Sequence, residues 1–215
     1  MTDRADSVLS RGEIAEVIDR LASLYPHVKC ALDHGSVWEL LICVTLSAQT
    51  TDVRVNSVTP ELFRRWPDAP SLAGADAAEV QEVIRSLGMY KTKSANIIRL
   101  AAKLIEVHDG LVPDDYDSLV ALPGVGRKTA NVVLAVGFGR ERIAVDTHVF
   151  RVSNRIGLCR EPDVLKTEEA LMKNLPEGRL AESHHYLIWH GRQVCRARKP
   201  GCGECVLDDL CLHNR

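Results

Sequence analysis

Several features that would mark a special class of protein are missing from this chain of 215 residues. It has no apolar run long enough to span a bilayer, because its longest uncharged stretch, Leu40–Thr51, covers 12 residues where about 20 are needed. The charged N-terminus lacks the apolar core of a secretory signal. Glycine and proline follow no repeat period, which excludes collagen-like and low-complexity sequences. We therefore expect a soluble, cytoplasmic protein with no membrane partner.

The chain also lacks a strong net charge. At −2, the total gives no hint of a polyanionic partner. The distribution is more informative, because three segments hold Lys and Arg but no acid: Val83–Ile105, Ser118–Arg140 and Arg192–Lys199. If these segments meet on one face, they form a basic stripe of the kind that contacts nucleic-acid phosphates. The charges alone are equally compatible with three unrelated solvated faces.

Signals for a β-sheet are absent too, since no Asn-Gly or Asp-Gly turn joins two alternating runs. The apolar spacing is helical instead, beginning with Ile14 to Tyr25 behind the capping box Ser10-x-x-Glu13. Further helices are predicted to begin at Ser36, Asp52 and Asp76, and the spacing of Ala95, Ile98, Ala102 and Ile105 marks a later one that ends near Gly110. The predicted fold class is all-α.

Cysteine, by contrast, is plentiful, and in a chain expected to be intracellular it favours metal binding or packing over disulfides. Four cysteines crowd the last 21 residues with the spacing C-x6-C-x2-C-x5-C: Cys195, Cys202, Cys205 and Cys211. This density suits either Zn²⁺ or an iron–sulfur cluster, and the spacing leaves both open. The remaining three (Cys30, Cys43 and Cys159) are interpreted as inert thiols, and the nearby His184, His185 and His190 as helix-packing residues.

A glycine-containing turn, Leu122–Ala130, lies between a short predicted helix (about 116–121) and a longer apolar one (about 127–138). Gly124 and Gly126 permit positive φ and a close approach of the backbone, so the turn can present amides at a helix N-terminus. Such an arrangement binds anions, and for a protein that reads DNA without regard to sequence the anion is a phosphate. The alternative is an ordinary turn between two helices.

Lys128 and Asp146 are the candidate chemical groups. Lys128 falls in the first turn of a predicted helix, where the helix dipole favours the neutral amine that a nucleophile needs and partial burial would add to this effect. Asp146 follows an apolar segment at the start of another helix, where it can cap that helix and also serve chemistry. The alternatives are a phosphate-contacting lysine and a purely structural cap.

Together these motifs resemble the endonuclease III family of helix-hairpin-helix DNA glycosylases. The resemblance runs from Leu40–Asp52 through the turn and Ala144–His148 to the final cysteines, nearly the whole chain. It implies a six-helix barrel domain at about 30–140 and a discontinuous domain, 1–29 plus 141–215, with the DNA cleft between them. It also implies that Cys195, Cys202, Cys205 and Cys211 bind a [4Fe–4S] cluster.

The resemblance further implies an enzyme of base excision repair, a bifunctional glycosylase and abasic-site lyase. An oxidised pyrimidine is flipped out of duplex DNA, Lys128 attacks C1′ as the base leaves, and Asp146 stabilises the positive sugar and helps to activate the lysine. The Schiff base then permits β-elimination of the 3′ phosphate. No metal acts in the reaction, and the protein is expected to be a monomer. The implied DNA contacts are Gln49, Met89, Leu122, Gly124, Val125, Gly126, Arg127, Thr129, His148, Arg196, Arg198 and Lys199.

Other functions share some of these features. A related adenine-mismatch glycosylase lacks the lysine at this place, and neither a non-catalytic DNA-binding module nor an iron–sulfur electron carrier explains the pair Lys128 and Asp146. One position departs from the family, because Met89 stands where a leucine usually wedges into the duplex. Methionine fills the same space less rigidly, which affects the range of substrates.

Overall fold

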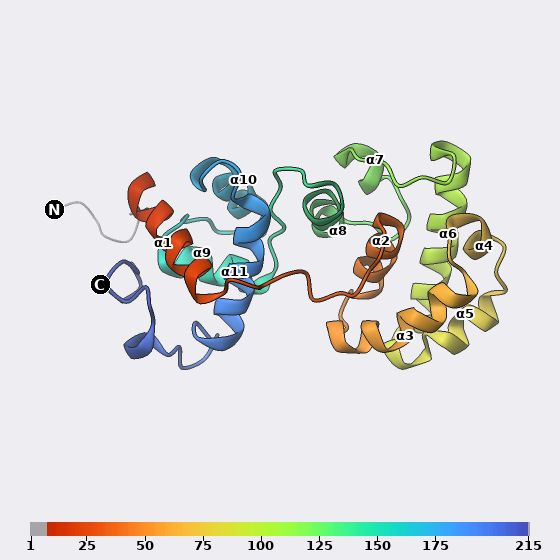
Figure 1. The fold of residues 1–215 in the computed structure, drawn as a ribbon, viewed down its shortest axis with the longest axis horizontal. Coiled ribbons are helices and arrows are strands. Elements are labelled where there is room, and N and C mark those ends of the chain that lie inside the picture. The colour runs from red at the N-terminus through yellow and green to blue at the C-terminus, as the bar shows by residue number, and fades with distance from the viewer. Residues whose placement is uncertain (1–7, 215) are drawn as a thin grey trace. The chain divides into compact units, whose positions relative to one another are not determined.

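The computed structural model describes residues 8–214 as a set of helices joined by short connections, and no β-strand occurs among those residues (Figure 1). The predicted all-α class is confirmed. The chain forms two compact units: Cys30–Gly139, and the segments on either side of it. Within the described range, no helix has both the length and the apolar character that crossing a bilayer requires.

The first unit, Cys30–Gly139, is built around α2 (Val37–Leu46). Every side chain from Leu40 to Leu46 is buried, so this helix is apolar on all sides and lies inside its unit. The surrounding elements are α3 (Asp52–Arg65), α4 (Ala69–Ala73), α5 (Ala77–Val83), the 3₁₀ turn η2 (Arg85–Leu87), α6 (Tyr90–His108), α7 (Tyr116–Val120), α8 (Arg127–Val132) and the π-helical segment η3 (Val133–Gly137).

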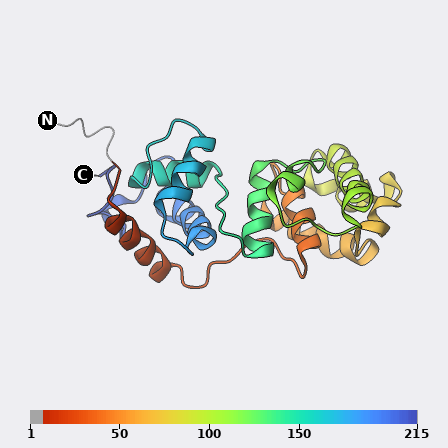
Figure 2. The same cartoon turned by 90° about the horizontal axis from the view of Figure 1, so that it is seen from above.

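The second unit joins the N-terminal helix α1 (Arg11–Leu24) to the C-terminal part of the chain. Its other elements are α9 (Thr147–Ile156), α10 (Val164–Asn174), α11 (Leu180–Gln193) and the 3₁₀ turn η4 (Cys202–Glu204). Both α1 and α9 pack along α11 (Figures 1 and 2). The buried face of α1 joins this core, so residues almost 200 positions apart in the sequence share one apolar interior.

The helix starts follow the predicted caps with one exception. The Ser10 hydroxyl accepts from the Glu13 amide and Glu13 returns the bond, which completes the predicted capping box. Ser36 and Asp76 also cap the helices that follow them. Asp52 does not, because it is already the first helical residue of α3, and Thr51 occupies the cap position without a side-chain bond.

Helix α6 is confirmed, but the apolar residues that marked it in the sequence are not its buried face. Ala95, Ala102 and Ile105 are exposed and Ile98 is half-buried. The helix instead buries a face rotated by about one residue: Lys93, Ser94, Ile97, Leu100, Ala101 and Leu104. The two polar residues of this set lie in the first turn, where Lys93 has partners from other parts of the chain that are described below.

Candidate catalytic and metal-binding sites

The glycine turn joins α7 to α8 as a tight hairpin. The Val125 amide donates to the Leu122 carbonyl at 3.1 Å, and both side chains are buried in the unit. Gly124 has φ +78°, and a Cβ there would lie 3.2 Å from the Cβ of Asn96 on α6. The fold therefore requires glycine at position 124, and Leu122 and Val125 can offer a ligand only their backbone.

Gly126 differs from Gly124. It is the N-cap residue of α8 with an extended backbone, φ −98° and ψ 177°, and does not use the positive φ that glycine permits. A Cβ at this position would meet no atom within 4 Å. The fold alone does not demand glycine at position 126, and its exposed backbone is open to an approaching group.

Lys128 occupies the first turn of α8, as predicted, and its side chain is exposed. The Arg127 guanidinium lies over the Tyr116 ring, 5.6 Å from its centroid, and Thr129 is half-buried. The amine of Lys128 is thus displayed at the end of the hairpin, where it can reach a ligand that sits on the exposed backbone of Gly126.

Asp146 is the N-cap of α9. Its Oδ1 accepts from the amides of His148 and Val149, both at 2.8 Å, which fixes the carboxylate at the positive end of the helix. Asp146 and His148 are both half-buried, so the second carboxylate oxygen is not locked inside the core. A cap of this kind presents an oriented carboxylate beside a rigid helix end.

Two arginines of α9 hold the segment that follows α11. Arg151 donates to the Gly191 and Cys195 carbonyls, each at 3.0 Å. Arg155 donates to the Arg196 carbonyl at 2.7 Å and to that of Ala197 at 3.0 Å, and its Nη1 lies 3.7 Å from the Cys195 sulfur. We call the segment 195–201 the basic loop; its Arg196, Arg198 and Lys199 side chains are all exposed.

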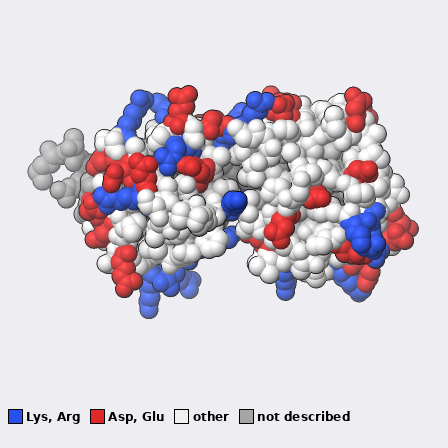
Figure 3. All heavy atoms as spheres, in the orientation of Figure 1, with Lys and Arg blue, Asp and Glu red and all other residues white. Residues whose placement is uncertain are grey.

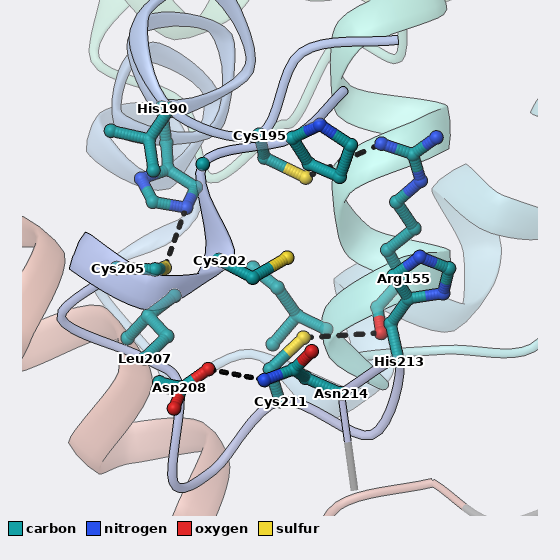
Figure 4. Close-up of a pocket in the computed structure, with 14 residues that line it drawn as sticks. Arg155, His190, Cys195, Cys202, Cys205, Leu207, Asp208, Cys211, His213 and Asn214 are labelled. Atoms are coloured by element: carbon teal, nitrogen blue, oxygen red, sulfur yellow. Dashed lines mark hydrogen bonds between the residues drawn. The ribbon is translucent and has the colours of Figure 1, made fainter. Parts of the chain in front are cut away.

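The four clustered cysteines line one pocket, with Arg155 and His190 beside them (Figure 4). No three His, Cys, Asp or Glu side chains among the described residues converge as the ligands of one metal ion would. In a tetrahedral zinc site the sulfurs lie about 3.8 Å apart, because each Zn–S bond is about 2.3 Å. Four cysteine thiols around one pocket are a donor set that fits an iron–sulfur cluster, whose inorganic core separates its ligands.

His190 connects this pocket to the core of its unit. The ring is 1% exposed, and burial lowers the pKa of His190 to about 4, so the imidazole is neutral at neutral pH. Its Nδ1 lies 3.4 Å from the Tyr25 hydroxyl, and its Nε2 lies 3.6 Å from the Cys205 sulfur. Burial raises the pKa of Tyr25 to about 12, so its O–H is available to donate to Nδ1 and leaves Nε2–H to donate to the sulfur.

The two predicted wedge residues lie on neighbouring loops of the first unit. Gln49 and Met89 are both exposed, Met89 to 51%. Both have left-handed backbone conformations, with φ 53° and 44° respectively. Non-glycine residues rarely adopt this conformation, and clusters of such strain are typical of functional loops.

The predicted basic stripe loses one of its members, because Lys93 is 5% exposed and its amine is directed into the protein. Arg85 and Lys103 form ion pairs with Glu82 and Glu106. On the face shown in Figure 3, Lys and Arg side chains are interspersed with Asp and Glu rather than gathered in one patch. Exposed cations remain in the hairpin, in the basic loop and at Lys91 and Arg99 of α6.

Comparison with known proteins shows the family. The HhH-GPD superfamily of base excision DNA repair proteins matches residues 42–177. Endonuclease III of Bacillus subtilis (strain 168) is 45% identical over 205 residues, 95% of this chain and 94% of that protein. The chain belongs to this family. Endonuclease III of Escherichia coli (strain K12) is 44% identical over 203 residues, covering 94% of this chain and 96% of its own.

Solved structures of the family agree. A trapped endonuclease III–DNA covalent intermediate, described as an estranged-adenine complex, has a TM-score of 0.89 at 45% identity and covers 96% of this chain and 97% of its own. A thermostable thymine-DNA glycosylase has a TM-score of 0.86 at 21% identity, which shows a shared fold alone. The resemblance inferred from the sequence is confirmed.

The sequence did not reveal the residues that support the cysteine pocket, Arg155 and Tyr25. Arg155 is 40 positions from Cys195 and Tyr25 is 165 from His190, so no local motif joins them. The one available signal was the pair of arginines four residues apart on a single helical face, Arg151 and Arg155.

Proposed function

We propose that this protein is a base excision repair enzyme that removes oxidised pyrimidines from duplex DNA and then cleaves the strand at the abasic site. The observation that carries the proposal is the exposed lysine at the end of the hairpin in a chain of this family. The related endonuclease III was trapped as a covalent intermediate with DNA, which supports the same chemistry here.

The hairpin positions the lysine on the DNA backbone. Amides of the turn, above all that of Gly126, accept a phosphate, and Lys128 follows two residues later on the same rigid helix end. The exposed Arg196, Arg198 and Lys199 of the basic loop add phosphate contacts without sequence preference. Gln49 and Met89 enter the space left by the extruded nucleotide.

In the reaction, the neutral amine of Lys128 attacks C1′ of the deoxyribose while the bond from C1′ to the base breaks. The base departs with the bonding electrons, and the carboxylate of Asp146 stabilises the positive charge that develops on the sugar. Loss of a proton from the attached nitrogen and opening of the sugar ring give the Schiff base. Removal of a proton from C2′ then expels the 3′ phosphate by β-elimination.

We further propose that Cys195, Cys202, Cys205 and Cys211 hold a [4Fe–4S] cluster with a structural role. When bound, the cluster ties the basic loop and the C-terminal segment together through four covalent ligands. The chain's own contribution is the surrounding support: Arg155 orders the start of the basic loop, and His190 donates toward Cys205 from the core. The chemistry at C1′ needs only Lys128 and Asp146.

Borohydride trapping tests this function. Reduction of the imine during turnover on a thymine-glycol duplex leaves DNA fixed to Lys128, which peptide mapping locates. Lys128→Ala abolishes trapping and strand cleavage but still binds lesion DNA. Lys173→Ala, at an exposed lysine of α10, retains trapping and strand cleavage. Asp146→Asn retains the helix cap and slows base excision by about 100-fold or more with a much smaller effect on binding.

The matched control for Asp146→Asn is Asp163→Asn, the same chemical change at the N-cap of α10, whose Oδ1 accepts from the Lys166 amide at 2.8 Å. Its excision rate stays at the wild-type level. On a pre-formed abasic site, where no base remains to be expelled, Asp146→Asn loses less activity than Lys128→Ala. Efficient trapping by Lys128→Ala would overturn the proposal and return Lys128 to the role of a phosphate contact.

A further inference from the structure

Lys93 is the one lysine of the first unit whose amine points into the protein among the described residues, with the side chain 5% exposed. Its Nζ donates to two groups from different parts of the chain: the Thr50 hydroxyl, 43 residues away, and the Leu87 carbonyl at 3.2 Å. The Thr50 hydroxyl in turn donates to the same Leu87 carbonyl at 2.8 Å. The three groups form a closed triangle of hydrogen bonds, which we call the lysine clip.

The clip joins the two loops that carry the exposed residues Gln49 and Met89. Thr50 directly follows Gln49, and Leu87 precedes Met89 by two residues. The Lys93 amide also donates to the Met89 carbonyl at 3.0 Å, so Lys93 holds the Met89 loop on both sides, by its side chain and by its backbone. A single side chain therefore bonds to both loops at once.

The loops need such a restraint, since each has a non-glycine residue in the left-handed region. That conformation is strained for a residue with a Cβ atom, and it persists only where the surroundings hold it. Burying an ammonium group is costly as well, and burial lowers the pKa of Lys93. A methionine or leucine would fill the same apolar space without this cost, so packing does not explain a lysine here.

We propose that Lys93 is a positioning residue that fixes Gln49 and Met89 at one separation, so that the two side chains enter the DNA stack together. The proposal rests on the proposed function, because it concerns the opening of a duplex around a flipped nucleotide. It predicts a selective defect. Substrates that need base extrusion depend on the clip, and single-stranded abasic DNA, which has no stack to open, does not.

Two variants break the clip from opposite sides. Lys93→Met keeps the length of the side chain and removes the amine, whereas Thr50→Val keeps the shape and leaves Lys93 in place. Both reduce kcat/KM on a thymine-glycol duplex by about tenfold to 100-fold, as expected for misplaced groups, and leave cleavage of single-stranded abasic DNA within about twofold of wild type. Lys93→Arg, which retains the donors, recovers part of the duplex activity.

Lys91→Met is the matched control, since Lys91 is an exposed lysine of the same helix. Loss of its charge weakens binding to duplex and single strand alike and leaves their ratio unchanged. Fluorescence of 2-aminopurine placed opposite the lesion gives a direct readout of unstacking. The rise in fluorescence on binding is reduced in Lys93→Met and Thr50→Val, as it is in Met89→Ala, but not in Lys91→Met.

The double variant Lys93→Met with Thr50→Val shows whether the two residues act through one hydrogen-bond network or independently. If Lys93 and Thr50 act through one network, the combined loss equals that of Lys93→Met alone. Additive losses of kcat/KM in the double variant would overturn the proposal. So would equal losses on duplex and single-stranded substrates in either single variant. If Lys93→Met does not fold, Thr50→Val alone decides the question. Failure of the proposed function looks different, since wild-type protein would then give no borohydride-trapped product at all.

Discussion

At the scale of single residues, the two glycines of the hairpin have different reasons to be glycine. Gly124 is needed for a left-handed turn packed against Asn96, whereas Gly126 is extended with open space where its Cβ would be. Because nothing within the fold fills that space, the absence of a side chain at position 126 serves the approach of a ligand to the backbone.

This contrast gives a paired prediction for alanine substitutions. Gly124→Ala destabilises the protein by about 2 kcal/mol or more, because it adds backbone strain and crowds Asn96. Gly126→Ala changes stability by less than about 1 kcal/mol but weakens DNA binding by about tenfold or more, since the methyl group keeps a phosphate from the amides. Thermal unfolding and fluorescence-anisotropy titration measure the two effects. Equal loss of affinity in two stably folded variants would contradict this division.

The sequence could predict residues whose role follows from near neighbours, and it could not predict those held by distant partners. Asp146 is recognisable because an N-cap bonds to amides two and three positions ahead, as it does here. Lys93 was misassigned to the surface because its partners, Thr50 and Leu87, come from other loops. A lysine is normally exposed unless it is paired, and only the fold shows the pair.

At the scale of secondary-structure elements, α9 organises the second unit. Asp146 is its N-cap, and further along the same helix Arg151 and Arg155 hold carbonyl groups of the basic loop. One rigid helix therefore sets the position of both the candidate catalytic carboxylate and the loop proposed to meet phosphates. A substitution in α9 that frees the loop and a substitution of an exposed residue on the loop should therefore have different effects.

Arg155→Gln and Arg198→Gln test this arrangement. Arg155→Gln removes bonds to two loop carbonyls, so we expect a lower iron content and lower thermal stability. Arg198→Gln removes an exposed charge from the loop, so iron content stays unchanged while the slope of log affinity against log salt falls by about one. Iron analysis and binding at several salt concentrations distinguish the two; a salt effect confined to Arg155→Gln would contradict the assignment.

Element types were easier to predict than the faces they bury. Helix α6 was expected from its periodic apolar residues, but Ala95, Ile98, Ala102 and Ile105 repeat as regularly as the set that is buried. The true face is anchored by Lys93 and Ser94, which a hydrophobicity rule places in solvent. The partners of Lys93 lie outside α6, so the pattern within the helix could not show that this lysine is buried.

At the scale of the whole molecule, the two units differ in what stabilises them. Cys30–Gly139 encloses the buried segment Leu40–Leu46 of α2, whereas three of the clustered cysteines, partly buried, pack against the core of the other unit. Metal bound at those cysteines therefore contributes folding free energy to one unit only.

Removal of iron tests this difference in the intact chain. The purified protein is expected to be yellow-brown, and after iron is chelated we expect amide hydrogen exchange to speed up in α1, α9 and α11 while α2 and α6 keep their protection. Cys202→Ser reproduces the effect, and Cys30→Ser, at a cysteine outside the cluster, does not. Equimolar zinc without iron in protein made under iron-replete conditions would overturn the cluster, and equal loss of protection in both units would contradict the one-sided contribution.

The discontinuous second unit also has a consequence for synthesis of the chain. Helix α1 leaves the ribosome before the rest of its unit, and α11, which packs along it, is made after the whole of Cys30–Gly139. At a translation rate of about 5–20 residues per second, the apolar face of α1 is made roughly 10–30 s before its packing partners. This face consists of Ile14, Val17, Ile18 and Leu21. The contiguous unit can fold during that interval. In the nascent chain, the apolar face of α1 is thus still uncovered when the unit Cys30–Gly139 can already be folded. An exposed apolar segment of this kind is a typical binding site for a chaperone.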